Sequence, residues 1–255
     1  MSLHIERSNP ASGRPVLVLL HGWGLHSGVW EPLLPALQQH FDTVLIDLPG
    51  LGRSEALLEP VTVQALAIAV LQQVPERAIW LGWSLGGLVA AEVARQAPER
   101  VCALVTVASN PCFVAHKDWP CGMAPETFDG FANSLASDPA RTLASFALLQ
   151  SRGAAAREIL RRLKVLLAGQ APADLAGTLQ LLAQDGRATL AALSQPALHI
   201  LGGEDQLVPA TLAEPLQRLQ PGAWLRCYED AGHLPFYSHQ ARFVEDLVAF
   251  AGAAS

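Results

Sequence analysis

A serine between two glycines is the sequence feature that most strongly suggests chemistry. Residues 78–94 read AIWLGWSLGGLVAAEVA, an apolar run that breaks around Ser84 and resumes with helical spacing. In a G-x-S-x-G motif, the serine sits on a sharp turn from a strand into a helix, and the glycines let neighbouring backbone pass close to it. The motif occurs by chance in roughly one chain in ten of this length, but the flanking strand and helix are the context that it requires. The sequence therefore predicts that Ser84 is a nucleophile.

A serine hydroxyl needs a general base and a carboxylate that orients the base. Among eight histidines, His233 is the best candidate, because it lies in the glycine-containing loop EDAGHLPF between the last predicted strand and the final helix. Asp205 follows the preceding predicted strand, in LHILGGEDQLVP, and is the expected orienting residue. Glu204 is its local rival, and Glu229 and Asp230 are further alternatives.

Two backbone N–H groups must bind the oxyanion that forms during acyl transfer. One is expected from Leu85, directly after the serine. The other is expected from Trp23, because the sequence HGWG at 21–24 follows the first strong strand. We interpret His21 as a residue that structures this loop, and His199, inside an apolar strand, as a packed core residue.

The elements that must position these residues alternate along the chain. Short continuous apolar runs, typical of strands buried on both faces, occupy 16–20, 43–47, 78–82, 103–108 and 197–202, with a last strand at 223–228. Helical patterns lie between them at 31–39, 62–73, 85–96 and 211–219. This alternation predicts an α/β fold with a mostly parallel, doubly wound sheet.

The strand pattern disappears over 113–190. Helical segments separated by proline or glycine follow one another there, near 125–136, 139–150, 154–168 and 173–184. We interpret this region as a helical cap inserted into a core that comprises residues 1–112 and 191–255.

Composition excludes several classes of function. A net charge of −6 in 255 residues argues against a nucleic-acid-binding protein. No stretch has the length of a membrane span or a signal peptide, so we expect a cytoplasmic protein without a membrane partner. The four cysteines lack the spacing of a metal site, and we expect no metal.

Basic residues are concentrated in one part of the predicted cap. Residues 139–170 hold six basic residues and one acid, a local charge of +5. Arg157, Arg161 and Lys164 have i, i+4, i+7 spacing, opposite an apolar face. This face is either a docking surface for an acidic partner or a phosphate group, or simply a solvated helix face.

Five motifs together carry a family resemblance: HGWG, DLPGLGRS at 47–54, GWSLGG, GGEDxLVP and AGHxPF. Over almost the whole chain the sequence resembles the α/β-hydrolase superfamily. Longer strings, such as LLHGWGLHSGVW, PERVCALVTVASNPCF and FALLQ, resemble its pimeloyl-(acyl-carrier protein) methyl ester esterases nearly residue for residue.

The resemblance implies a serine carboxylesterase of biotin biosynthesis that releases methanol and the free ω-carboxylate without any cofactor. Ser84, Asp205 and His233 would form the catalytic triad, and the acyl channel would be lined by Phe146, Ala147, Leu148, Leu149 and Gln150. Trp83, Phe113 and Leu207 are further wall candidates, equally well explained as packing.

The resemblance also implies that the partner is an acyl-carrier protein, which would dock on the cap through Arg141, Arg157 and Arg161. Ser145 stands where the family pattern leads us to expect a charged residue, so the docking set is incomplete. We expect a monomer.

Two other functions fit the same residues. A general short-chain carboxylesterase, a lactonase or a carbon–carbon bond hydrolase would use the same triad, because a fold does not determine a substrate. A ligand receptor that retains a hydrolase triad is the alternative from another class.

Overall fold

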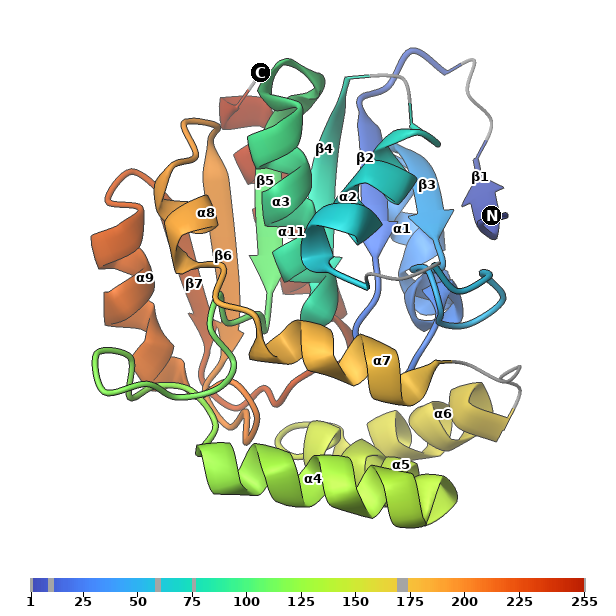
Figure 1. The fold of residues 1–255 in the computed structure, drawn as a ribbon. Coiled ribbons are helices and arrows are strands. Elements are labelled where there is room, and N and C mark those ends of the chain that lie inside the picture. The colour runs from blue at the N-terminus through green and yellow to red at the C-terminus, as the bar shows by residue number, and fades with distance from the viewer. Residues whose placement is uncertain (1, 9–11, 58–60, 75–76, 169–173, 255) are drawn as a thin grey trace.

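A computed structural model describes residues 2–8, 12–57, 61–74, 77–168 and 174–254. Within these ranges the strands form one sheet of seven, in the order β1-β3-β2-β4-β5-β6-β7 (Figure 1). The strands are β1 Ile5–Arg7, β2 Val16–Leu20, β3 Asp42–Ile46, β4 Ala78–Trp83, β5 Val101–Val107, β6 Ala197–Gly202 and β7 Trp224–Tyr228. All pairs are parallel except β1 with β3. The predicted α/β class and doubly wound sheet are confirmed.

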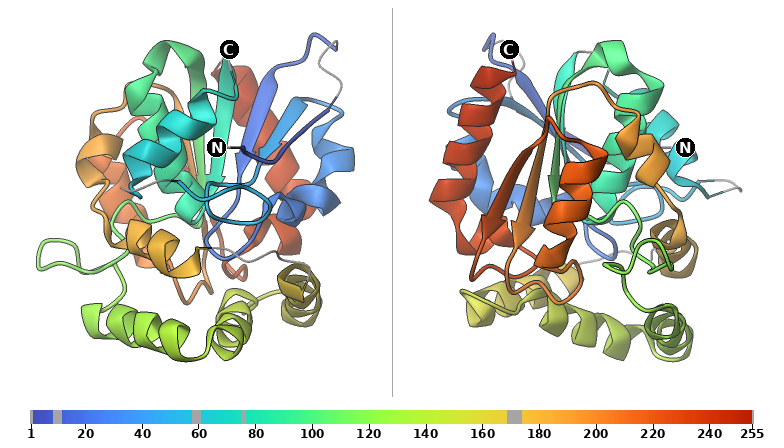
Figure 2. Two further views of the ribbon diagram at one scale, coloured as in Figure 1. Left: turned by 45° about the vertical axis from the view of Figure 1, so that its right-hand side comes forward. Right: turned by 90° about the vertical axis from the view of Figure 1, so that its left-hand side faces the viewer.

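The central strands read as apolar runs because both faces of the sheet are covered. In β2, Val18 and Leu20 belong to one buried cluster, while Leu17 and Leu19 belong to the other. Helices α2, α3, α8 and α9 lie over one face, and α1 and α11 over the other (Figures 1 and 2). The bounds of these helices are α1 Leu34–Leu37, α2 Val63–Leu71, α3 Leu85–Gln96, α8 Arg187–Ala191, α9 Ala213–Leu219 and α11 Gln240–Ala253.

The structure differs from the sequence expectations in three details. The edge strand β1 was not predicted, because its three residues include two charged ones and carry no apolar run. The helix expected at 31–39 is a 3₁₀ turn, Ser27–Leu33, followed by the single turn α1, since Pro32 and Pro35 lack the N–H that a longer α-helix needs. Helix α8 was not predicted, because a five-residue helix is too short to show a period.

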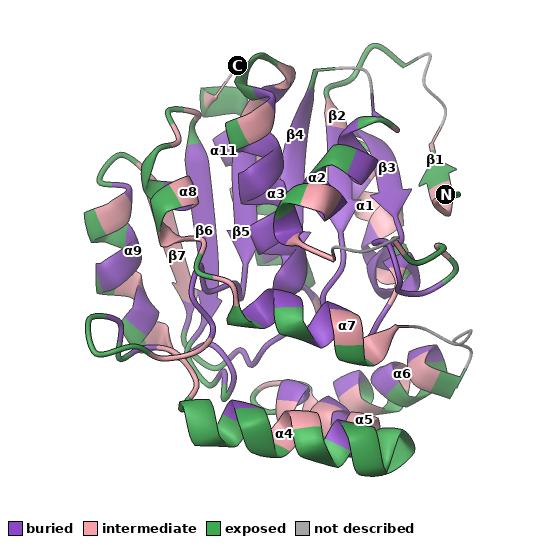
Figure 3. Cartoon of the chain, in the orientation of Figure 1, coloured by how far each residue is buried: buried purple, intermediate pink, exposed green. Residues whose placement is uncertain are grey.

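Between β5 and β6 the chain leaves the sheet and forms helices beyond the carboxyl ends of the strands (Figures 1 and 2). They are α4 Pro125–Ser137, α5 Pro139–Gln150, α6 Ala156–Ala168 and α7 Leu175–Leu179, followed by the 3₁₀ turn Gln180–Ala183. The Asp138 side chain caps α5 by accepting from the Arg141 N–H at 3.0 Å. Helix α4 is the most exposed of the four (Figure 3). Within the described ranges, no helix is long and apolar enough to cross a membrane.

The turn from β4 into α3 requires glycines on both sides of Ser84. A Cβ on Gly82 would clash with the carbonyl oxygen of Gly86, and a Cβ on Gly86 would clash with that of Leu20. Helix α3 therefore packs directly against the backbone of β4 and β2, and this contact fixes where the turn points.

Replacement of Gly82 by alanine should destabilise the fold by about 3 kcal/mol or more, because the methyl group meets rigid backbone. Gly130→Ala is the matched control: Gly130 lies inside α4, and an added Cβ meets no atom within 4 Å. The control should raise stability by about 0.5–1 kcal/mol through helix propensity. Urea unfolding of both variants measures these changes, and equal midpoints for Gly82→Ala and the native protein would contradict the prediction.

Candidate active site

Ser84 occupies a strained turn at the carboxyl end of β4. Its φ of 54° and ψ of −119° are unusual for a residue with a side chain. The Ser84 N–H donates to the Val107 carbonyl at 2.9 Å, and the Ser84 carbonyl accepts from the Gly87 N–H at 2.9 Å and from the Ser109 hydroxyl at 2.7 Å. These bonds hold the backbone in the conformation that G-x-S-x-G predicts.

Asp205 and His233 form a buried pair. Asp205 Oδ2 and His233 Nδ1 are 2.7 Å apart, and both side chains are almost fully buried. Asp205 Oδ1 accepts from the N–H groups of Leu207 and Val208, at 2.8 and 3.1 Å. Because the carboxylate accepts these bonds, it remains oriented toward the ring, where Oδ2 can accept a hydrogen bond from Nδ1.

The rival carboxylates lie elsewhere. Glu204, Glu229 and Asp230 are exposed, and Asp230 pairs with His239 at 2.9 Å. The structure therefore brings Asp205, and none of its three rivals, to His233.

The two loops that carry this pair are joined through their backbones. The Gly203 N–H donates to the Tyr228 carbonyl at 2.8 Å, and the Glu204 N–H donates to the Ala231 carbonyl at 2.9 Å. A Cβ on Gly202 would clash with the Gly232 carbonyl. Gly202, Gly203 and Gly232 are thus needed for one close contact between the two backbones. This contact sets the distance between Asp205 and His233.

Trp83 connects the serine turn to the histidine loop. Its indole Nε1 donates to the His233 carbonyl at 2.8 Å, and the two rings are 5.4 Å apart. The indole is fully buried and also packs edge-on against Phe236 at 5.5 Å. Among the described residues, His233 Nε2 is buried and has no hydrogen-bond partner. This nitrogen is therefore available to take a proton from a hydroxyl.

The predicted oxyanion donors come from two segments that both lie next to Ser84. Leu85 is the first residue of α3, so its N–H has no acceptor within the helix. The loop that carries Trp23 passes the nucleophile closely, because a Cβ on Gly22 would lie 3.2 Å from the Ser84 Cβ. The Trp23 indole donates to the Leu175 carbonyl at 3.2 Å and packs edge-on against Phe131 and Phe146.

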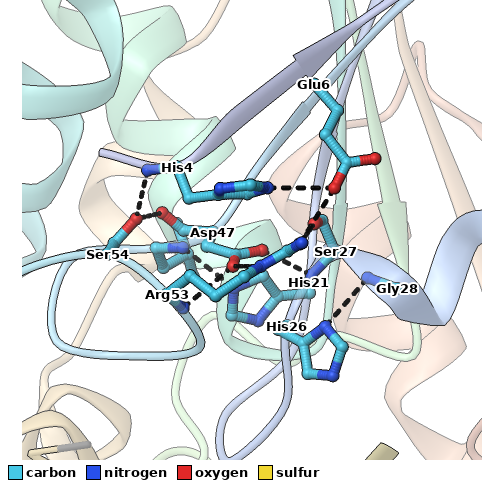
Figure 4. A network of polar contacts seen from close by, with 10 residues as sticks. His4, Glu6, His21, His26, Ser27, Gly28, Asp47, Arg53 and Ser54 are labelled. Carbon is cyan, nitrogen blue, oxygen red and sulfur yellow. Dashed lines mark hydrogen bonds and ion pairs between the residues drawn. The ribbon is translucent and has the colours of Figure 1, made fainter. Parts of the chain in front are cut away.

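A polar network holds the loop of Trp23 at both ends (Figure 4). At its start, His21 accepts from the Leu48 N–H at 2.8 Å, and its other nitrogen lies 2.8 Å from the Gly22 carbonyl. Near its end, the buried carboxylate of Asp47 accepts from the Ser27 N–H at 2.7 Å. This arrangement agrees with the interpretation of His21 as a residue that structures the loop.

Arg53 completes the network. Its Nε and backbone N–H both donate to Asp47 at 3.0 Å, and its guanidinium also donates to the Ser27 hydroxyl at 2.9 Å. Burial alone would raise the pKa of Asp47, but His21 and the bonds from Arg53 and Ser27 hold it well below its usual range. Sequence reasoning did not assign a role to Asp47 or Arg53; their only signal was the motif DLPGLGRS.

The predicted channel residues do not share one face, since they are consecutive in helix α5. Phe146 and Leu149 pack against the core, and Ala147 and Gln150 are buried. Leu148 points outward, with 55% of its surface exposed. Trp83, Phe113 and Leu207 are buried.

The predicted docking arginines Arg141, Arg157 and Arg161 are all exposed. Arg161 lies 3.8 Å from Glu158, an exposed pair on the same helix. The apolar face of α6 is buried through Ile159, Leu163 and Leu166.

Comparison with known proteins gives consistent matches over nearly the whole length. The family model described as alpha/beta hydrolase fold matches residues 15–240. The pimeloyl-(acyl-carrier protein) methyl ester esterase of Klebsiella pneumoniae is 47% identical over 238 residues, covering 91% of this chain and 92% of the relative. The protein of the same name from Pectobacterium atrosepticum is 45% identical over 247 residues, covering 95% and 96%.

Solved structures support the same fold. An esterase from Exiguobacterium antarcticum superposes with a TM-score of 0.88 at 24% identity, covering 98% of this chain and 95% of that one. An enol-lactonase from Burkholderia xenovorans gives a TM-score of 0.85 at 23% identity, covering 98% and 96%. At such identity these structures show a shared architecture alone.

Two buried histidines should make stability depend on pH. Burial lowers the pKa of His21 and of His199 from 6.5 to about 4. His199, a core residue as predicted, lies 2.7 Å from the Thr106 hydroxyl and 2.8 Å from Gln220 Oε1. The unfolded chain takes up these protons near pH 6.5 while the folded chain does not, so stability is present above pH 6.5 and is lost as pH falls toward 4.

Each histidine should contribute up to about 1.4 kcal/mol per pH unit to this slope. Urea unfolding at pH 7, 6 and 5 measures it. His199→Gln should make the slope shallower, whereas His40→Gln, at an exposed position, should leave it unchanged. An unaltered slope in His199→Gln would refute this explanation.

Proposed function

The chain belongs to the alpha/beta hydrolase family, and from this premise we propose that it is a serine carboxylesterase acting on the methyl ester of pimeloyl-(acyl-carrier protein). The products are methanol and the free ω-carboxylate, in biotin biosynthesis. The observation that carries the proposal is the buried Asp205–His233 pair, 2.7 Å apart, joined through Trp83 to the turn that holds Ser84. The two relatives named for this reaction, at 45–47% identity, support the choice of substrate.

Each group of the site has one task in the reaction. His233 Nε2 removes the proton of the Ser84 hydroxyl as Oγ attacks the ester carbonyl, and Asp205 stabilises the imidazolium that forms. The N–H groups of Trp23 and Leu85 donate to the oxyanion. When the tetrahedral intermediate collapses, the imidazolium protonates the departing methoxide, which leaves as methanol. Water, deprotonated by His233, then attacks the acyl-serine. As the second tetrahedral intermediate breaks its bond to Ser84 Oγ, the imidazolium returns the proton to that oxygen and the acid is released.

A groove between α4 and α5 supports entry of a long, carrier-linked acyl chain. The groove has a volume of about 640 Å³ and is lined by Ser134 and Ser145 along its walls, with Arg141 at the N-terminal end of α5. Phe131 and Phe146 also line it, and their rings lie 5.5 and 5.4 Å from that of Trp23. The groove thus adjoins the aromatic ring of a residue that we propose as an oxyanion donor.

The charge of the cap supports an acidic carrier protein as the partner. Arg141, Arg157 and Arg161 are exposed on α5 and α6, in a chain that is acidic overall. Long-range attraction of this kind speeds the encounter of oppositely charged partners. Cytoplasmic location and a monomeric state stay predictions of the sequence.

Ser84→Ala should abolish hydrolysis of the pimeloyl-(acyl-carrier protein) methyl ester while the protein stays folded. Loss of the nucleophile typically lowers the rate on the order of 10³-fold or more. Mass spectrometry of the carrier protein follows conversion of the methyl ester to the acid. A loss of only a fewfold would contradict the assignment of Ser84. If the native protein cleaves p-nitrophenyl acetate but leaves the carrier-linked ester intact, the substrate assignment falls and the general esterase remains.

Charge reversal on α6 should separate docking from chemistry. Arg157→Glu with Arg161→Glu should lower kcat/KM for the carrier-linked ester by roughly tenfold or more, because both side chains would then repel an acidic partner. Turnover of p-nitrophenyl acetate should change less than twofold. The double reversal Arg77→Glu with Arg218→Glu, at exposed positions outside α5 and α6, controls for the same change in net charge. Equal losses on both substrates would contradict a docking role.

A further inference from the structure

The segment that carries His233 is held by the hairpin of α5 and α6 on both sides of the histidine. We call residues 230–237 the histidine segment. Before His233, the Ala154 N–H in the turn between α5 and α6 donates to the Asp230 carbonyl at 2.7 Å. After it, Arg162 Nε on α6 donates to the Tyr237 hydroxyl at 3.0 Å. Two contacts from one hairpin therefore bracket the histidine.

At the contact before His233, the backbone of residues 152–154 packs directly on the backbone of residues 230–232, with no side chain between them. A Cβ on Gly232 would clash with the Arg152 carbonyl, and a Cβ on Gly153 would lie 2.6 Å from the Asp230 carbonyl oxygen. On the other side, Gly202 at the end of β6 has no room for a Cβ against Gly232. The histidine segment is thus enclosed between β6 and the turn that joins α5 to α6. A shift of that turn must therefore move the histidine segment.

The contact after His233 distinguishes Arg162 from the other basic residues of 139–170. Its side chain is 34% exposed, against 77% for Arg161 next to it. Besides its bond to Tyr237, it pairs with Glu31 at 3.4 Å and lies 5.6 Å from the centre of the Tyr237 ring. Arg162 therefore points toward Glu31 and Tyr237, which lie outside the cap, and away from the exposed arginines of the proposed docking surface.

Tyr237 connects Arg162 to buried parts of the molecule. Its hydroxyl donates to the Val29 carbonyl at 2.6 Å. Burial raises the pKa of Tyr237 to about 12, so the hydroxyl keeps its proton at neutral pH. The neighbouring Phe236 packs on Trp83, whose indole donates to the His233 carbonyl. Arg162, Tyr237 and the serine turn are thus connected through a continuous chain of contacts.

We propose that Arg162 and Tyr237 are positioning residues for the general base His233. Asp205 fixes one nitrogen of the ring, but the direction of the unpartnered Nε2 depends on where the backbone of the histidine segment lies. Proton transfer from a serine hydroxyl is sensitive to small displacements of this kind. The inference rests on the proposed roles of Ser84 and His233, and it holds for any ester that reaches them.

The test measures kcat and KM for p-nitrophenyl acetate, which needs no carrier protein. Arg162→Gln and Tyr237→Phe should each lower kcat about tenfold with KM within twofold, because binding of a small ester does not use them. The double variant should be no slower than the slower single variant, since both changes break the same contact. Arg162→Lys, whose ammonium can still reach the tyrosine hydroxyl, should recover part of the loss.

The matched control is Arg218→Gln, which removes the same charge from an exposed pair with Glu214, at 2.6 Å on helix α9. It should leave kcat unchanged. Circular dichroism during thermal unfolding checks that all variants are folded at the assay temperature.

The inference is overturned if Arg162→Gln keeps the kcat of the control, if the two losses multiply in the double variant, or if a lowered melting temperature is the only change. These results leave the proposed function standing, provided that the native protein still hydrolyses the carrier-linked ester. Conversely, a native protein that cleaves only p-nitrophenyl acetate refutes the proposed substrate and leaves this inference testable.

Discussion

The site depends on one strained backbone position, the turn at Ser84 between β4 and α3. A residue with a side chain is held at a φ of 54°, which typically costs about 1–3 kcal/mol. The surrounding contacts keep it there, because α3 lies directly against β4 and β2 at glycines and because Val107 and Ser109 bind the serine backbone. The hydroxyl therefore sits at the carboxyl edge of the sheet, where the other loops can reach it.

The two loops that complete the site are fixed by different physical means. Polar side chains fix the loop of Trp23: a neutral histidine at its start and the Asp47–Arg53 pair near its end (Figure 4). Close backbone packing between glycines fixes the loop of His233 instead. The first arrangement contains a histidine whose pKa is lowered to about 4 by burial, whereas the second has no room for a Cβ at Gly202 or Gly232.

Helix α6 carries both the proposed docking arginines and a contact to the histidine segment. Its apolar residues Ile159, Leu163 and Leu166 are buried, its exposed face carries the proposed docking arginines Arg157 and Arg161, and Arg162 reaches Tyr237 between these faces. A partner bound to the exposed face would thus rest on the element that holds the histidine segment. If both proposals hold, the cap would influence catalysis through His233 as well as bind the carrier protein.

The sequence by itself determined the parallel sheet, because strands buried on both faces must be continuous apolar runs, and it placed Ser84 and His233 at strand ends by their glycine-rich motifs. It also favoured Asp205 over its neighbours; in the structure Asp205 lies 2.7 Å from His233, and its catalytic role stays a prediction. Only the tertiary structure decided which polar side chains meet at a distance. Arg161 and Arg162 are adjacent and chemically identical, yet Arg162 alone contacts a tyrosine 75 positions away. Helical spacing gives the angle at which a side chain leaves its helix, but the partner at that angle depends on how the whole chain packs.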